Sequence, residues 1–281
     1  MNTINKKVND KTMILFFSLV ILFTTIVDTL LFTTHNEVLY LVLMWIPGVS
    51  AIIVSIFQSI IDKEKFSLKR IFDLLGFKLC NVKYIAFSFI VPLIYLLIPY
   101  IIYWVSNPND FAYTGVSIWL ILSDCAPALV IGVFTNLISA IGEEIGWRGF
   151  LVSALANKYG NKKSLTISSL FWCVWHFPLI ITGNYLANIP VYYQLPMFTL
   201  CIFPVGIISG IYALETGSVW PSAFFHAAHN NYDQGVFQII TRPSDKMMYF
   251  VSETGIYTII FVWIFAIITI IRHNNIRNEV K

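Results

Sequence analysis

The sequence predicts an all-α fold, a polytopic membrane helix bundle of about eight transmembrane helices, formed by a single integral membrane domain over residues 1–281. Hydrophobic residues make up 57% of the chain and charged residues only 12%, whereas soluble domains carry roughly 25% charged residues. The mean hydropathy is +0.74. Apolar stretches of about 20 residues, the length that crosses a bilayer, also recur along the chain.

Eight apolar stretches are long enough to be spans. No repeat of fixed period divides them into separate units, which favours one domain. Their expected limits are 12–33, 38–61, 84–105, 117–142, 164–182, 191–214, 218–238 and 254–272.

The positions of the basic residues indicate how the chain is oriented. Of the 18 Lys and Arg, all but Arg242 and Lys246 fall before the first span, between spans two and three, after span four, or at the C-terminal end. Eight spans place these four segments on one side, and cytoplasmic loops are the ones enriched in Lys and Arg. We therefore predict that both termini are cytoplasmic. The Ile-, Lys-, Asn- and Phe-rich composition suggests an AT-rich genome and hence a bacterial cell membrane.

The segments between spans offer few functional signals. The longest, 62–83, has apolar positions at helical spacing from Phe66 onward, which predicts an amphipathic helix on the cytoplasmic surface, with a substrate or lipid contact as the alternative. The scattered basic residues do not indicate nucleic-acid binding. The four cysteines show no CxxC spacing, so neither a disulfide framework nor a zinc–thiolate site is expected.

The first polar motif is the run Ile141-Gly-Glu-Glu-Ile-Gly-Trp-Arg148 at the edge of the fourth span. Residues four apart share a helix face, so Glu144 can pair with Arg148. Glu143 is turned away by about 100° and is left free to accept a proton. Gly142, Gly146 and Gly149 would let other backbone or a substrate approach closely. The alternative is a salt bridge at the cytoplasmic boundary, with both glutamates in contact with water.

The second motif places His176 near mid-membrane, with Trp172 one turn earlier on the same face, where it could pack against or shape a pocket. In the third motif, His226 and Asn230 share a face of the seventh span and can both donate hydrogen bonds, as an oxyanion hole requires. A buried structural histidine and a polar contact between helices are the respective alternatives.

Other polar residues within the spans are not expected to belong to this site. His229 and Asn231 lie on different faces from His226 and Asn230. The remaining acids fall near the predicted ends of spans and are expected to be hydrated boundary residues. They are Asp28, Asp124, Asp233 and Glu215.

Taken together, Glu143-Glu144-x-x-x-Arg148, Trp172-x-x-x-His176 and His226-x-x-x-Asn230 resemble the three signature motifs of the CAAX-protease and bacteriocin-processing family of intramembrane endopeptidases, also called the Abi family, which includes the Rce-type enzymes. Order and spacing match over roughly residues 117–240, which is the expected motif-bearing core. One departure is Trp172, where the family usually has Phe.

The resemblance implies an endopeptidase whose site opens toward the cytoplasm and whose substrate is a membrane-associated peptide or protein. We expect Glu143 to activate a water as general base and His176 to orient it. His226 and Asn230 would stabilise the oxyanion, while Glu144 and Arg148 would support the cluster. No cofactor is favoured.

Zinc is the competing cofactor, with Glu143, His176 and His226 as ligands and Glu144 as a further donor. The chain lacks HExxH, which is why the metal-free mechanism is favoured. Two other classes of function remain open: a non-catalytic membrane immunity or scaffold protein, and a small proton-coupled transporter. The sequence does not select a substrate, although a bacterial source disfavours a prenylated one.

Overall fold

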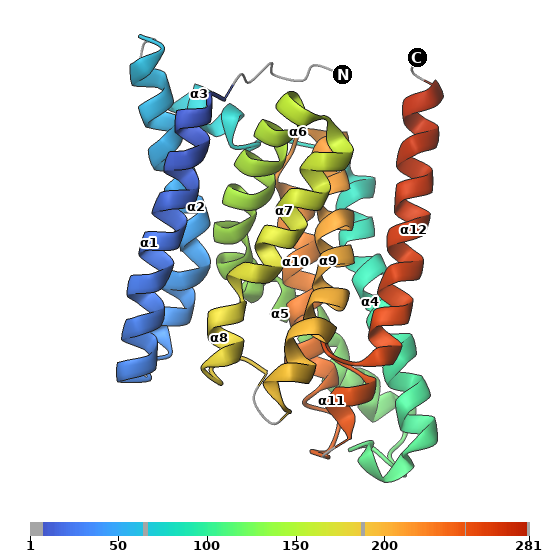
Figure 1. Cartoon of the computed structure of the whole chain (residues 1–281). Coiled ribbons are helices and arrows are strands. Elements are labelled where there is room, and N and C mark those ends of the chain that lie inside the picture. Colours follow the sequence, from blue (N-terminus) through green and yellow to red (C-terminus); the bar gives the residue numbers. More distant parts are fainter. Residues whose placement is uncertain (1–7, 64–66, 187–188, 245, 280–281) are drawn as a thin grey trace.

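The computed structural model describes residues 8–63, 67–186, 189–244 and 246–279, and within these ranges the chain forms helices and no strands. Figure 1 shows the helices packed side by side as a bundle. The all-α fold class is therefore confirmed. The short helices η2 and η3 are π-helical.

The helices have these bounds: α1 (Asp10–Thr34), α2 (Val38–Ile61), α3 (Leu68–Leu74), α4 (Val82–Ser106), η1 (Pro108–Asp110), α5 (Ile118–Glu144), η2 (Ile145–Val152), α6 (Ser153–Tyr159), α7 (Asn161–Trp175), α8 (Phe177–Ile181), α9 (Val191–Thr216), α10 (Trp220–Tyr232), η3 (Asp233–Phe237), α11 (Met247–Phe250) and α12 (Ile256–Glu279).

Seven helical segments of the described chain are long and apolar enough to cross a membrane. The predicted span 218–238 is also helical, as α10 followed by η3, but it is not among the seven. Its helix α10 carries both polar residues of the third motif, His226 and Asn230, and packs against α4, α5 and α9 in the middle of the bundle. This element is therefore enclosed by the more apolar helices, which is where polar side chains within a membrane are found.

The fourth predicted span is longer than expected, because α5, η2 and α6 form one continuous helical segment, Ile118–Tyr159. Glu143 and Glu144 consequently lie inside the bundle rather than at a boundary. Arg148, predicted to lie in the loop after this span, is buried within η2. The predicted end of the fourth span at residue 142 was wrong, because hydropathy falls at the charged motif while the helix continues.

The fifth predicted span is interrupted at His176, between α7 and α8. Pro178 is the second residue of α8 and has no backbone N–H to continue the hydrogen bonds of α7. The interruption turns the chain next to the second motif. His176 was predicted to lie within a helix, but it lies at the C-terminal end of α7.

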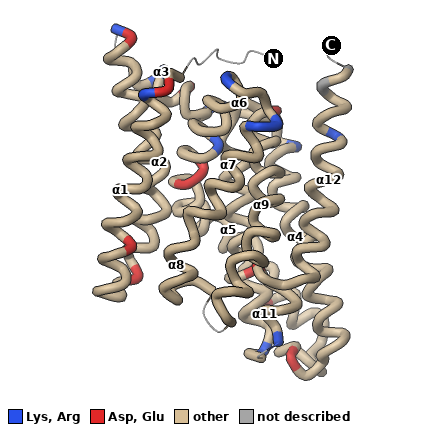
Figure 2. Tube along the Cα trace, viewed as in Figure 1, with Lys and Arg blue, Asp and Glu red and all other residues tan. Residues whose placement is uncertain are grey.

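The two ends of the bundle differ in charge. α1 begins and α12 ends at the same end of the molecule (Figure 1), and most Lys and Arg residues of the described chain gather there (Figure 2). The predicted surface helix is present as α3, with the Ser67 hydroxyl accepting a hydrogen bond from the backbone N–H of Arg70; its expected start at Phe66 lies outside the described residues.

Candidate active site

The first motif is held where two helices come unusually close. A Cβ added to Gly142 would lie 2.8 Å from the carbonyl oxygen of Met44, and one added to Gly146 would lie 2.5 Å from backbone and side-chain carbons of Pro47. No residue with a side chain fits at either position without moving α2. The expected close approach at these glycines is thus confirmed, and it presses α2 against α5 and η2.

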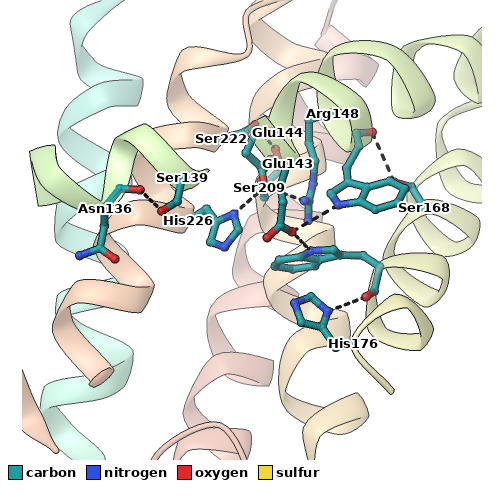
Figure 3. Close-up of polar contacts among 12 residues, drawn as sticks. Asn136, Ser139, Glu143, Glu144, Arg148, Ser168, His176, Ser209, Ser222 and His226 are labelled. Atoms are coloured by element: carbon teal, nitrogen blue, oxygen red, sulfur yellow. Dashed lines mark hydrogen bonds and ion pairs between the residues drawn. The ribbon is translucent and has the colours of Figure 1, made fainter. Parts of the chain in front are cut away.

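Glu144 is the centre of a buried polar group (Figure 3). Arg148 donates through Nη1 to Glu144 Oε1 at 2.7 Å, and His226 Nδ1 lies 3.0 Å from the same oxygen. Ser209 on α9 donates to the other carboxylate oxygen at 3.2 Å. The predicted pairing of Glu144 with Arg148 is confirmed, whereas the boundary salt bridge is not, since Glu144 is 0% exposed.

Glu143 has different partners from Glu144. Its Oε2 accepts hydrogen bonds from the indole N–H of Trp172 at 2.6 Å and of Trp147 at 3.3 Å. Trp172 was expected to act through packing and shape, and sequence reasoning missed both indole donors. Trp172 also stacks under the Arg148 guanidinium, whose Cζ lies 4.2 Å from the ring centroid. Trp172 therefore links Glu143 to the pair formed by Glu144 and Arg148.

The hydrogen bond of His176 defines which of its nitrogens is available. Nδ1 lies 2.8 Å from the carbonyl oxygen of Trp172. A carbonyl only accepts, so Nδ1 carries the proton and Nε2 is the acceptor of the neutral ring. The rings of Trp172, Trp175 and Phe198 surround the imidazole.

A cavity of about 290 Å³ brings the motifs together. Its lining includes Glu143, Trp172, His176, His226 and Asn230, which come from α5, α7, α10 and the α7–α8 junction. Glu144 and Arg148 are not part of the lining and lie behind it, beside His226. The predicted division between an open and a paired glutamate is thus present in the geometry.

A second polar group forms the far end of the same cavity. His229 and Glu253 line it, and His229 Nε2 lies 3.2 Å from Glu253 Oε1. Tyr185 donates to Glu253 Oε2 at 2.5 Å. The expectation that His229 stands apart from the site was wrong. Asn231, as expected, points elsewhere, donating to the carbonyl oxygen of Ala128 on α5 at 3.1 Å.

The cavity leads from the motifs toward the end of the bundle opposite the termini. Tyr40 lies near the start of α2, Asn184 follows α8, and Glu253 precedes α12. These segments lie at the end away from the start of α1 and the end of α12 (Figure 1). The expectation that the site opens toward the cytoplasm stays a prediction.

Two of the four acids expected to be hydrated boundary residues, Asp233 and Glu215, are buried instead. Asp233 is fully buried, and the side chain of Glu215 is only 2% exposed and is bound by Arg272 and His273 of α12. Asp28 is half-buried, with Oδ1 shielded from solvent. Asp124 is exposed as predicted and accepts a hydrogen bond from the Tyr113 hydroxyl.

The site residues do not group as zinc ligands would. Among the described residues, no three His, Cys, Asp or Glu side chains come together closely enough to hold a metal ion. A catalytic zinc requires three protein ligands around one point. The arrangement of Glu143, His176 and His226 therefore does not fit the zinc set considered from the sequence.

Comparison with known proteins gives two findings. The family model described as Type II CAAX prenyl endopeptidase Rce1-like matches residues 125–232. A protein named CAAX prenyl protease 2 from Methanococcus maripaludis is 31% identical over 191 residues, or 63% of this chain, and the chain spans 65% of its length. The part of the chain that carries the motifs is therefore similar to the Rce1-like family. This confirms the resemblance drawn from the motifs, and all three motifs fall within the residues that the Rce1-like model matches.

Trp172, which stands where the family usually has Phe, adds a hydrogen bond to the site. A phenylalanine in place of Trp172 could pack in the same position but would have no N–H for Glu143. The hydrogen bond of 2.6 Å is therefore a feature that the tryptophan adds to the motif in this chain.

Proposed function

We propose that this protein is an intramembrane endopeptidase that hydrolyses a peptide bond of a membrane-associated peptide or protein, using a water activated by Glu143. The observation that carries the proposal is the Glu143 carboxylate in a cavity that it shares with His176, His226 and Asn230. The match of residues 125–232 to the Rce1-like family model and the name of the archaeal relative support the same class of reaction.

Glu143 and His176 supply the groups that activate water. The two indoles hold Oε2 of Glu143 in place, and the carboxylate can take a proton from a water in the cavity. His176 donates from Nδ1 to a backbone carbonyl, so its Nε2 is the nitrogen left to accept a hydrogen bond from that water. A general base positioned in this way contributes about 10²- to 10⁴-fold to a hydrolytic rate.

His226 and Asn230 supply donors for the oxyanion. As the water oxygen bonds to the carbonyl carbon, the C=O electrons move onto oxygen and require hydrogen-bond donors nearby. The Asn230 amide can donate directly. His226 has Nδ1 beside the Glu144 carboxylate, and in its imidazolium form Nε2 also carries a proton. Collapse of the intermediate breaks the C–N bond, and the proton on Glu143 passes to the leaving amine.

The mechanism is proposed to proceed without a metal. Purified protein should retain its peptidase activity after exhaustive chelation and removal of metal, verified by elemental analysis. Activity lost on chelation and restored by zinc would overturn this part of the proposal.

The proposed reaction is tested by replacing Glu143 with Gln, which keeps the shape of the side chain but removes the base. Membrane peptides from cells carrying the Glu143→Gln protein should accumulate uncut precursors relative to wild type. Glu215→Gln is the matched control, because Glu215 is another buried glutamate and lies outside the cavity. Equal peptide profiles for wild type and a folded Glu143→Gln protein would favour an immunity, scaffold or transport role instead.

A further inference from the structure

Glu253 brings a carboxylate into the active-site cavity from outside the three motifs. It lies in the loop between α11 and α12 and lines the cavity together with His229 and Tyr185. Each of its buried oxygens has one partner, since His229 Nε2 lies 3.2 Å from Oε1 and Tyr185 donates to Oε2 at 2.5 Å. A carboxylate has about four lone-pair sites. Glu253 can therefore accept further hydrogen bonds from a molecule in the cavity.

His229 can hold Glu253 without neutralising it. The hydroxyl oxygen of Tyr95 lies 2.7 Å from Nδ1 of His229. A neutral imidazole with its proton on Nε2 accepts from Tyr95 and donates to Glu253, so both ring nitrogens are paired with no charge on the ring. The described residues that line the cavity include no Lys or Arg. The negative charge of Glu253 is then left without a cation in contact with it.

Tyr185 connects this carboxylate to the catalytic end of the cavity. Its ring centroid lies 6.0 Å from that of His176, and its hydroxyl donates to Glu253. Gln234 Nε2 donates to the same hydroxyl at 2.8 Å and fixes its direction. Glu253 is thus one tyrosine side chain away from the imidazole proposed to orient the water. A long side chain next to a peptide bond held at Glu143 and His176 spans that separation.

Burial makes charge the decisive property of a side chain that meets Glu253. An ionised carboxylate without a counter-ion is costly in a low-dielectric interior. A Lys ammonium or an Arg guanidinium supplies both the charge and several N–H donors, and charge-assisted hydrogen bonds are roughly twice as strong as neutral ones. An acidic side chain would instead place two like charges together. An apolar one would leave the carboxylate unpaired.

We propose that Glu253 is a specificity-determining residue that binds the Lys or Arg side chain of a substrate residue next to the scissile bond. The proposal rests on the endopeptidase function proposed above. It defines the substrate class as a membrane-associated peptide or protein with a basic residue at the point of cleavage. Tyr185 and His229 are the positioning residues that hold the carboxylate toward that side chain.

The cleavage sites themselves test the proposal. Peptide ends that form in membranes of wild-type cells but not in Glu143→Gln cells are identified by mass spectrometry. We expect Lys or Arg next to the cut at most of these sites. Glu253→Gln should lower cleavage at the basic sites by about tenfold or more, and Glu253→Asp, which keeps the charge, should restore part of it. Glu215→Gln, a buried glutamate outside the cavity, should leave these sites unchanged.

Two results would overturn the proposal. One is a set of Glu143-dependent sites with no excess of Lys or Arg beside the cut, a result that does not require any Glu253 variant to fold. The other is unchanged cleavage at basic sites by a folded Glu253→Gln protein. Loss of the basic sites in Glu253→Gln and their partial return in Glu253→Asp would support a role for the charge rather than for packing.

Binding of a small cation separates this proposal from the proposed reaction. n-Hexylammonium and neutral n-hexanol are titrated by calorimetry against the full chain in detergent. The wild type and Glu143→Gln should bind the ammonium at least about tenfold more tightly than the alcohol, and Glu253→Gln should lose this preference. A preference that is lost in Glu143→Gln but kept in Glu253→Gln would overturn the proposal.

The two experiments can fail independently. If no peptide depends on Glu143 but the preference for the ammonium depends on Glu253, the cation site is supported and the peptidase function fails. If cleavage depends on Glu143 but the wild type binds both probes equally, the peptidase function is supported and the cation site is overturned.

Discussion

Two buried carboxylates in this bundle, Asp233 and Glu143, differ in how completely they are hydrogen-bonded. Asp233 accepts from the Tyr100 hydroxyl at 2.9 Å on Oδ1, and from Ser252 at 2.8 Å and Gln238 at 3.0 Å on Oδ2. Glu143 receives both of its indole hydrogen bonds on Oε2 and lines the cavity. Asp233 does not line the cavity. The first carboxylate is suited to holding helices together and the second to reacting.

The backbone alone does not make this distinction. Glu143 lies just before the π-helix η2, and Asp233 is the first residue of the π-helix η3. π-helical turns are frequent at functional sites, and here one accompanies each carboxylate. What separates the two is how many donors hold the carboxylate and whether a cavity reaches it.

The largest effect is expected at Glu143. Removal of the base by Glu143→Gln should lower the rate of peptide hydrolysis by about 10²- to 10⁴-fold with little change in thermal stability. The rate is measured on a precursor identified in the membrane-peptide comparison. Asp233→Asn, assayed in parallel, should retain the wild-type rate, and a comparable loss there would remove the distinction between the two carboxylates.

The second largest effect is expected at Arg148, as a loss of stability. Arg148→Met leaves the Glu144 carboxylate buried with one cationic partner fewer, which typically costs about 3–5 kcal/mol. Unfolding in detergent measures this loss. Arg272→Met is the control, because Arg272 is about one-third exposed in its pair with Glu215 and should lose less. Similar losses in both variants would show that burial of the motif pair has no special energetic role.

A smaller effect is expected at Trp172. Trp172→Phe keeps an aromatic ring but removes the N–H bonded to Glu143, and hydrogen bonds to charged groups contribute about 1.5–3 kcal/mol. We expect the rate to fall by roughly tenfold or more.

Trp175→Phe is the matched control for Trp172→Phe. Trp175 is on the same helix, but its indole donates to Thr24 at 2.8 Å and not to Glu143. Its rate of peptide hydrolysis should match that of the wild type. A fall of the same size in both variants would mean that general packing around His176, rather than the hydrogen bond to Glu143, accounts for the loss.

The smallest effect is expected at Asp233. Asparagine retains one acceptor oxygen but brings an amide N–H₂ opposite the donors at the other, so Asp233→Asn should destabilise the fold by about 1–3 kcal/mol. Unfolding in detergent again gives the value. A stability equal to that of the wild type would show that the paired carboxylate does not hold α4, η3 and the loop before α12 together.

Much of the fold could be predicted from hydropathy and charge. Spans were predicted correctly where apolar residues run without interruption, as in α1, α2, α4, α9 and α12. The continuation of α5 through η2 was not predicted, because a helix does not need apolar residues when other helices surround it. The break at His176 had a signal in the sequence, since Pro178 disfavours an uninterrupted helix.

The site could be predicted in part. Helical spacing was sufficient to pair Glu144 with Arg148, because both lie on one helical segment. The contact between Glu144 and His226 joins residues 82 positions apart, so spacing along one helix could not predict it. Glu253 belongs to no motif recognised in the sequence, and only the folded chain brings it to the cavity.

One feature of the cavity governs its electrostatics. The described residues that line it include two carboxylates, Glu143 and Glu253, and three imidazoles, of His176, His226 and His229, but no Lys or Arg. With two carboxylates in its lining and no Lys or Arg among the described lining residues, this space favours a neutral or cationic segment over an anionic one.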